Sequence, residues 1–507
     1  MSQISRRGND VMNMNSKESQ RRWWAEASII YMLETRVFYI ITRSGVIDRP
    51  RGGTSTTCFT RGEWQKEGLH LSSASDQACK LYDAAISQYI GWYEEPSLGG
   101  ISKTVQEMIS IDPNFVMGRA LSVGLDLMGT GRSVLLDDDF QKDIKNLEAM
   151  TENQVNLLTP REKDHVKALL TWASGNWVEA TNIWEDILQS HPTDILALKL
   201  AHDTFFYLGY QKEMKDSVEK VLPHWSPDIP LYGHLFGMYA FGLVEIESYK
   251  KAENNAKKGL EINAKDAWST HALAHVFEME GRVDEGVTFL RNTAEDWKVC
   301  GLLACHNFWH WALYHIEKGE SEAALDIFDS QVSERMKSGA MLDIVDSTSL
   351  LYRLELAGVN VGDRWKDVFD LCRPHFDDHI LAFNDIHLLL SSVGSKNKDA
   401  TNYLMSSLQE FMRTGSGTNH TITKDVGYSL CEAIVAYDEG RVEDCCDILY
   451  PLRYNIVQIG GSNAQRDMFN LLLIAAAMKS TCKHHQSVLR QLLSERTRFK
   501  SISQVPD

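Results

Sequence analysis

Two pairs of histidines, each with a four-residue spacing, are the side chains in this sequence best suited to chemistry. His271 and His275 lie in the run DAWSTHALAHVFEME, and His306 and His310 lie in the run ACHNFWHWALY. Histidines at i and i+4 share one face of a helix, where they can bind a metal ion or exchange protons with a ligand. Glu278, close to one further turn along, could supply a third ligand group.

Three interpretations of these histidines remain open: they could bind a metal ion, contact a peptide or a small polar ligand, or pack in the core. Both pairs lack the glutamate that makes a zinc-peptidase helix catalytic. We expect no cofactor, and we keep His271, His275 and Glu278 as the candidate ligands if a metal binds. No Ser, His and Asp set and no phosphate-binding loop stands out, so the sequence establishes no enzyme activity.

The histidine pairs lie within a repeated helix-turn-helix pattern. Gly175 and Gly209 are 34 residues apart (209 minus 175), which is the length of a tetratricopeptide repeat. Trp177, Ala180 and Trp184 follow Gly175 at the offsets that such a repeat uses for the packing of its second helix. The pattern therefore predicts helical hairpins of the tetratricopeptide kind.

The same pattern continues along the chain. Turns at Gly281 and Gly319 follow, and Ala324 and Phe328 take the packing positions after the second of them. Proline is sparse, with 11 residues, and no long segment alternates in the manner of a strand. We predict an all-α fold: a right-handed α-solenoid of tetratricopeptide-like helical hairpins, each burying its apolar stripe against its neighbours.

Four regions follow from how clearly the repeat can be read. They are an irregular and disordered N-terminal extension (1–70), degenerate N-terminal helical repeats (71–160), tetratricopeptide-like repeats (161–330) and degenerate C-terminal helical repeats (331–500).

The concave surface of such a solenoid is the expected ligand-binding groove, because the first helix of each repeat lines it. Two successive repeats contribute the histidines and two tryptophans, and Asp343, Asp346 and Arg353 lie on the first helix of the next. Arg353 could clamp a ligand carboxylate. The competing interpretation assigns the tryptophans to the core and the charged residues to a solvated helix face. The predicted groove residues are Trp268, His271, His275, Glu278, His306, Trp309, His310, Asp343 and Arg353.

Charge and cysteine usage limit the partners and the compartment. The chain has 52 basic and 69 acidic residues, a net charge of -17, which disfavours nucleic acid and anionic membranes as partners. Its nine cysteines lack the spacing of a disulfide framework or a zinc knuckle. The most apolar early run, Ile29 to Ile41, is interrupted by charges and too short to span a bilayer. We expect a cytoplasmic protein.

Several phrases resemble the tetratricopeptide repeat protein 38 family. They are DPNFVMG (112–118), HPTDILALK (191–199), FYLGYQ (206–211), ACHNFWHWALY (304–314) and GGSNAQRD (460–467). The resemblance covers roughly residues 74–495 and leaves the first 70 outside. It implies a cytosolic helical-repeat protein and carries no established activity.

The expected function is that of a cytosolic binding protein whose groove, lined by His and Trp, holds a protein segment, a peptide or a small polar ligand. The alternative is an enzyme that uses the histidine cluster, with or without a metal, for acid and base chemistry. A third possibility is a scaffold that binds partners through its convex face.

Overall fold

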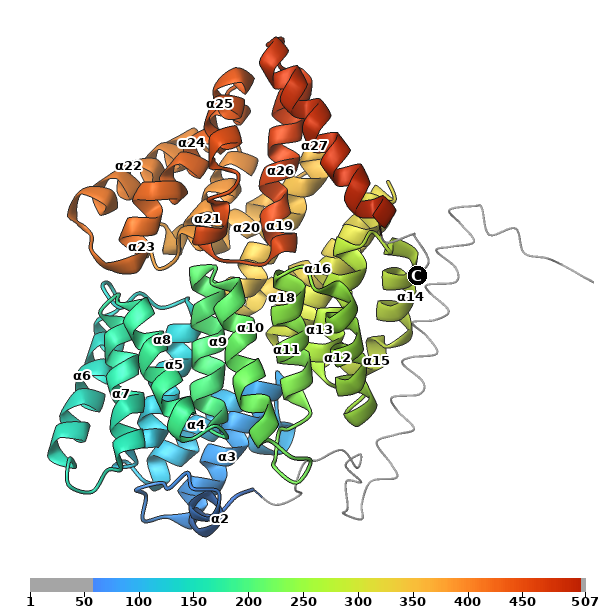
Figure 1. Cartoon of the computed structure of the whole chain (residues 1–507). Helices are drawn as coiled ribbons and strands as arrows, with labels where there is room; N and C mark the ends of the chain where they lie inside the picture. The colour runs from blue at the N-terminus through green and yellow to red at the C-terminus, as the bar shows by residue number, and fades with distance from the viewer. Residues whose placement is uncertain (1–57, 503–507) are drawn as a thin grey trace, which may run out of the picture. The chain divides into compact units, whose positions relative to one another are not determined.

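The computed structural model describes residues 58–502, with side chains described as far as residue 496. The described residues all belong to one compact unit of the chain. Within this part of the chain, every regular element is a helix, and the only strand-like pairing is one bridge between Tyr93 and Cys300 (Figure 1). The all-α prediction is confirmed.

Helical hairpins follow one another along the whole described chain, and the two helices of each hairpin are in contact. In chain order the pairs are α3 (Asp76–Gly91) with α4 (Ile101–Ile111), α5 (Val116–Gly129) with α6 (Asp138–Asn153), α7 (Pro160–Ala173) with α8 (Trp177–Ser190), α9 (Ile195–Leu208) with α10 (Gln211–Val221), α11 (His234–Glu245) with α12 (Tyr249–Ile262), α13 (Ala267–Met279) with α14 (Val283–Asn292), α16 (Leu302–Glu317) with α17 (Ser321–Ile327), α19 (Met341–Leu356) with α20 (Arg364–Cys372), α21 (Ala382–Gly394) with α22 (Lys398–Thr414), α24 (Tyr428–Asp438) with α25 (Val442–Leu452), and α26 (Asn463–Lys479) with α27 (Lys483–Ile502).

Short helices connect or precede these hairpins. They are α2 (Arg61–Lys66), α15 (Ala294–Trp297), α18 (Ser333–Arg335) and α23 (Gly417–Ile422), together with η1 (Pro96–Leu98), η2 (Leu222–His224), η3 (Phe328–Val332), η4 (Met336–Ser338), η5 (Arg373–His375), η6 (Thr423–Gly427) and η7 (Ile456–Ile459).

The hairpin of α7 and α8 shows how the sequence specifies one repeat. Thr159 and Glu162 form a capping box that begins α7, each side chain accepting a hydrogen bond from the other residue's backbone N–H. Across the turn, the rings of Trp172 and Trp177 stack with centroids 5.1 Å apart. Ala180 is fully buried, which lets the two helices approach closely. The predicted packing positions in this repeat are therefore used for packing.

The first and second helices of the hairpins have different environments. Every residue of α13 from Ala267 to Phe277 is buried, whereas α12 buries only Ala252, Ala256 and Gly259. A helix that is buried on all sides must have neighbours on its concave side as well as on its flanks. The concave side of this solenoid is therefore covered.

The covering comes from the C-terminal hairpins, which contact turns in the N-terminal half. The carbonyl oxygen of Gly175 accepts a hydrogen bond from the backbone N–H of Thr418 at 2.8 Å. Farther along, Glu245 at the end of α11 accepts from the backbone N–H of Asn463 at 3.0 Å and from Arg466 at 3.2 Å. The solenoid thus closes on itself, which the periodicity of its repeats does not predict.

Gly209 is required at one of these closing contacts. Its φ of 67° lies in the left-handed region, and a Cβ atom at this position would lie 1.9 Å from the carbonyl oxygen of Val457. The backbone of the segment before α26 therefore lies directly against the turn between α9 and α10.

The N-terminal boundary of the folded unit differs from the expected one. Residues 1–57 of the predicted extension lie outside the described residues, but residues 61–66 form α2 and Trp64 is only 7% exposed. The Trp64 ring packs edge-on against Tyr82 of α3, with centroids 5.5 Å apart. The expectation of an irregular segment as far as residue 70 was wrong for α2, because a single buried Trp anchors this short helix.

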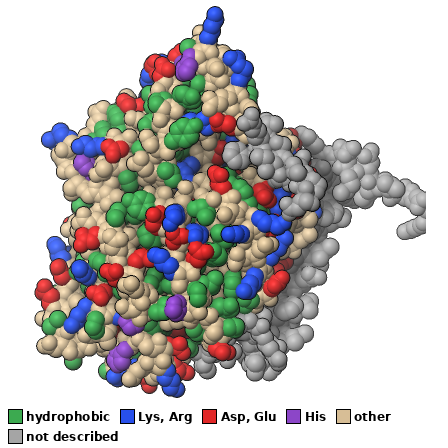
Figure 2. Space-filling model, in the orientation of Figure 1, with side chains coloured by type: hydrophobic (Ala, Val, Ile, Leu, Met, Phe, Trp, Pro, Cys, Tyr) green, Lys and Arg blue, Asp and Glu red, His purple; other side chains and the backbone are tan. Residues whose placement is uncertain are grey.

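The described surface mixes charges of both signs with scattered apolar side chains (Figure 2). Among the described helices, none is both long enough and apolar enough to cross a bilayer.

Candidate functional site

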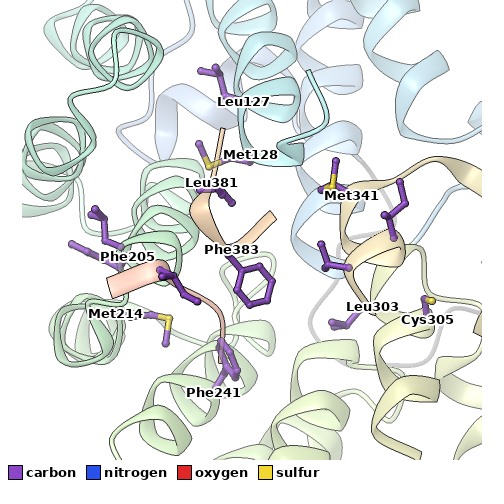
Figure 3. Packing of buried hydrophobic residues seen from close by; sticks show 14 of the residues in the cluster. Leu127, Met128, Phe205, Met214, Phe241, Leu303, Cys305, Met341, Leu381 and Phe383 are labelled. Atoms are coloured by element: carbon purple, nitrogen blue, oxygen red, sulfur yellow. The ribbon is translucent and has the colours of Figure 1, made fainter. Parts of the chain in front are cut away.

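The closed solenoid contains a cavity of about 560 Å³. Its lining comes mainly from α3, α4, α5, α9, α11, α13, α16, α19 and α21, and from the start of α26 with the segment that precedes it. Figure 3 labels six of the lining residues, Met128, Phe241, Leu303, Met341, Leu381 and Phe383. They come from α5, α11, α16, α19 and α21, with Leu381 directly before α21. Pockets that bind small molecules measure about 300 to 1,000 Å³. The cavity is therefore of the size that holds a small organic molecule.

Part of the lining is exposed, at α4 and at Gly129 at the end of α5, and the rest is buried or half-buried. Glu94, Ser102 and Gln106, on and just before α4, are exposed, which indicates that the cavity opens beside this helix. Aromatic side chains, among them Trp268 and Phe383, form much of the buried wall. Such a wall favours a ligand with an aromatic or apolar body.

The charged groups of the lining are all acidic. Glu94, Asp126 and Asp203 line the cavity, and no Lys or Arg occurs among the described residues that line it. Asp203 accepts hydrogen bonds from the Tyr89 hydroxyl at 2.7 Å and from the Lys199 ammonium group. This arrangement favours a neutral or cationic polar group on a ligand over a carboxylate or a phosphate.

Lys199 lies behind this wall in an aromatic surround. Its side chain is fully buried, and its Nζ lies 4.4 Å from the ring centroid of Tyr89 and 4.9 Å from that of Trp92. Burial lowers the pKa of Lys199, and the carboxylate of Asp203 opposes this effect. The ammonium group of Lys199 holds the Asp203 carboxylate in place at the cavity wall.

The four histidines of α13 and α16 form one cluster. Nε2 of His275 lies 2.8 Å from Nε2 of His271 and 3.2 Å from Nε2 of His310. One ring nitrogen from each of these and of His306 lies within 4.8 Å of the others. Neighbouring first helices in the stack place the two i, i+4 pairs face to face.

Two carboxylates orient two of these imidazoles from behind. His310 Nδ1 lies 2.6 Å from Oε2 of Glu278, and His306 Nδ1 lies 2.9 Å from Oδ2 of Asp346. Both contacts occupy Nδ1 and leave Nε2 free for the interior of the cluster. His306 also stacks on Trp309, with centroids 5.0 Å apart and an interplanar angle of 11°.

Burial favours the neutral form of three imidazoles of the cluster. Burial and the neighbouring imidazoles lower the pKa of His271, His275 and His310 well below the ordinary histidine value. Burial raises the pKa of Glu278 to about 7, although Arg353 opposes this shift. At neutral pH these imidazoles have lone pairs available for bonding.

The predicted groove residues divide into three groups. Trp268, His271, His275 and His306 line the cavity. Three others do not line the cavity: His310 belongs to the four-histidine cluster, and Glu278 and Trp309 contact histidines of that cluster. Asp343 and Arg353 neither line the cavity nor contact one of the four histidines. The expectation that these nine form an open groove differs from the structure: eight are buried and Glu278 is partly buried, because the C-terminal hairpins cover the concave surface.

Arg353 stabilises the closure rather than facing the cavity. It donates hydrogen bonds to the carbonyl oxygens of Ala464 at 2.6 Å and Gln465 at 3.2 Å, in the first turn of α26. Asp343 accepts a hydrogen bond from the Ser338 hydroxyl at 3.0 Å. The geometry therefore does not support the expected role of Arg353 as a carboxylate clamp.

The sequence did not predict the polar residues that the N-terminal half contributes to the cavity lining. Tyr89 comes from α3 and Asp203 from α9, both outside the expected groove. One signal was present: Lys199 and Asp203, at i and i+4, are the charged pair of a mostly apolar helix. A charged pair within a buried helix marks a candidate site.

Comparison with known proteins adds the following similarities. No protein-family model matches the chain. Among solved structures, a Rap protein complexed with competence and sporulation factor is 11% identical, with 67% of this chain and 98% of that chain covered and a TM-score of 0.41. Yeast Tom70 is 10% identical, with 74% and 90% covered and a TM-score of 0.31. The TPR domain of P58(IPK) is 15% identical, with 69% and 100% covered and a TM-score of 0.20. All three TM-scores lie below 0.5.

Proposed function

We propose that the protein binds a small organic molecule inside the closed solenoid. The observation that carries this proposal is the cavity of about 560 Å³, which has a buried aromatic wall and an exposed side at α4. An extended peptide in the concave groove would need an open surface along successive first helices. The contacts of Thr418 and Asn463 with the N-terminal half cover that surface.

The lining also defines the class of ligand. An aromatic or apolar body would pack against side chains such as Trp268 and Phe383, and a neutral or cationic group would face Asp203. A cytoplasmic location, as expected from the sequence, belongs to the same proposal. An enzymatic role would use the same cavity, and it would be distinguished by turnover of the bound molecule rather than its retention.

A thermal-shift screen with the full-length protein tests this proposal. Amines and neutral aromatic compounds should raise the melting temperature, because a ligand that binds only the folded state stabilises it in proportion to RT ln(1 + [L]/Kd). Carboxylates and phosphates of similar size should have smaller effects.

Two matched variants locate the binding. Ser122 on α5 lines the cavity, and Ser122→Trp would fill part of it. Ser406 on α22 is exposed and lies outside the lining, so Ser406→Trp serves as the control. The proposal requires the ligand-induced shift to disappear in the first variant and persist in the second. Equal shifts in both would place the ligand elsewhere and contradict it.

A further inference from the structure

The four-histidine cluster has a hydrogen-bonding conflict that neutral imidazoles can meet only with a three-centre hydrogen bond or with one contact left unbonded. A neutral imidazole nitrogen carries either one proton or one lone pair. Nε2 of His275 has two ring nitrogens as neighbours, at 2.8 and 3.2 Å. As a donor it would have to direct one hydrogen at both, and as an acceptor it would have to take two hydrogens on one lone pair.

A metal ion at the centre of the cluster removes this conflict, because it accepts a lone pair from every Nε2. We propose that His271, His275, His306 and His310 bind one divalent first-row transition metal ion, with zinc as the ion that best fits four nitrogen ligands. Four imidazoles suit zinc, which takes four ligands in a tetrahedron at about 2.0 to 2.1 Å from each nitrogen. In such a tetrahedron the nitrogens lie about 3.3 Å apart. The four ring nitrogens lie within 4.8 Å of one another, so small rotations of the rings would bring them around one ion.

The residues behind the cluster support this assignment independently. Histidine ligands of metals usually donate their second N–H to a carboxylate or a carbonyl oxygen, which fixes the ring and its tautomer. Glu278 and Asp346 accept from Nδ1 of His310 and His306 in this way. Two carboxylates would also balance the charge of a divalent ion, which a buried site requires.

The role of Glu278 differs from the one expected from sequence. Spacing made it a candidate third ligand beside His271 and His275, whereas the structure places it behind His310. The second pair of histidines supplies the missing ligands instead. Because three of the four imidazoles also line the cavity, the ion would lie at its wall.

The test is metal analysis of the purified full-length protein, followed by titration of chelator-treated protein with Zn²⁺ and Co²⁺. We expect one equivalent of metal that resists dialysis, and visible absorption bands typical of tetrahedral cobalt after titration. Absence of metal on purification, together with no uptake of either ion on titration, would overturn the proposal.

Three variants assign the ion to these residues. His275→Gln should lower the affinity for zinc at least tenfold, and Asp346→Asn should lower it by about 10- to 100-fold, as found for carboxylates behind metal ligands. His387→Gln is the matched control, because His387 is buried on α21 and bonds only to the Phe383 carbonyl oxygen at 2.7 Å. Equal affinity in His275→Gln and in the parent would overturn the assignment.

A second measurement keeps the proposal testable if His275→Gln does not fold. X-ray absorption at the zinc edge of the parent protein should show a shell of nitrogen ligands with the multiple scattering of four imidazoles. Sulfur ligands, or a shell made mainly of water oxygens, would contradict binding at this cluster.

Discussion

The carbonyl oxygen of Gly175 accepts hydrogen bonds from both the backbone N–H and the hydroxyl of Thr418, 243 residues later in the chain. A repeat array in which each unit touches only its neighbours makes no contact of this range. The contact joins the turn between α7 and α8 to α23 and helps to close the solenoid around the cavity. The ligand-binding proposal depends on this closure.

Substitution of Gly209 tests the closing contact at the turn after α9. Gly209→Ala and Gly319→Ala both place a side chain on a left-handed residue, which costs about 1 to 2 kcal/mol. Only Gly209 has a backbone atom in the way, the carbonyl oxygen of Val457, whereas nothing lies within 4 Å of the Cβ position at Gly319. Urea denaturation should therefore show a distinctly larger loss for Gly209→Ala. Equal losses would mean that the segment before α26 does not lie on this turn.

The buried pair of Glu245 and Arg466 should be costly to break. Both side chains are less than a tenth exposed, so Glu245→Gln leaves a buried guanidinium without its charge partner, at a cost of about 3 to 5 kcal/mol. Glu219→Gln removes an exposed partner of Lys215 and should cost no more than about 1 kcal/mol. Chemical denaturation compares the two. A small loss for Glu245→Gln would show that the closure does not depend on this pair.

Asp343 should make the protein less stable as the pH rises towards 8. Burial, and secondly the charge of Asp346, raise the pKa of Asp343 to about 7, above its value of about 3.9 in an unfolded chain. A carboxyl group with a raised pKa contributes its full stability below the unfolded value and loses it as the pH rises through the folded one. Between pH 5 and pH 8 the free energy of unfolding should fall by roughly 1 to 3 kcal/mol from this group.

Asp343→Asn should make the pH dependence smaller and should be more stable than the parent at pH 8. Part of the dependence should remain, because burial also raises the pKa of Glu278 to about 7. Asp425→Asn, at an exposed position, is the control and should leave the pH profile unchanged. Thermal melts at pH 5, 6, 7 and 8 measure the effect. A parent-like slope in Asp343→Asn would show that another group causes it.

Trp64 should set the limit for truncation at the N-terminus. Trp64→Ala removes a buried ring that packs on Phe59 and Tyr82, at a cost of about 3 to 5 kcal/mol. Leu157→Ala, at a side chain that is 72% exposed, should cost little. Deletion of residues 1–57 should likewise leave the melting temperature within a few degrees. If deletion of residues 1–70 is equally harmless, α2 does not stabilise the fold.

Much of the fold could be predicted from sequence because each repeat carries its own local signals. The glycines 175, 209, 281 and 319 all lie at turns, as predicted, and have a left-handed backbone there. Ser462 caps α26 by accepting a hydrogen bond from Gln465 N–H. The closure could not be predicted, since it depends on how small rotations between hairpins add up along the chain. No local sequence pattern predicts the total of these rotations.

The candidate site could be predicted only in part, because only some of its contacts lie within a single helix. The i, i+4 spacing correctly places His271 beside His275 and His306 beside His310, since it depends only on helix geometry. The partnership of Glu278 with His310 depends on the packing of α13 against α16, and the contribution of Asp203 depends on closure. The spacing of residues along a single helix predicts neither of these contacts.

Native mass spectrometry of the full-length protein, incubated with a small-molecule extract and then desalted, tests the central claim most directly. We predict a non-covalent adduct of small-molecule mass on the parent protein and on Ser406→Trp, and its loss on Ser122→Trp, whose new side chain occupies the cavity. An adduct of equal abundance on all three proteins, or no adduct on any of them, would contradict an interior binding site.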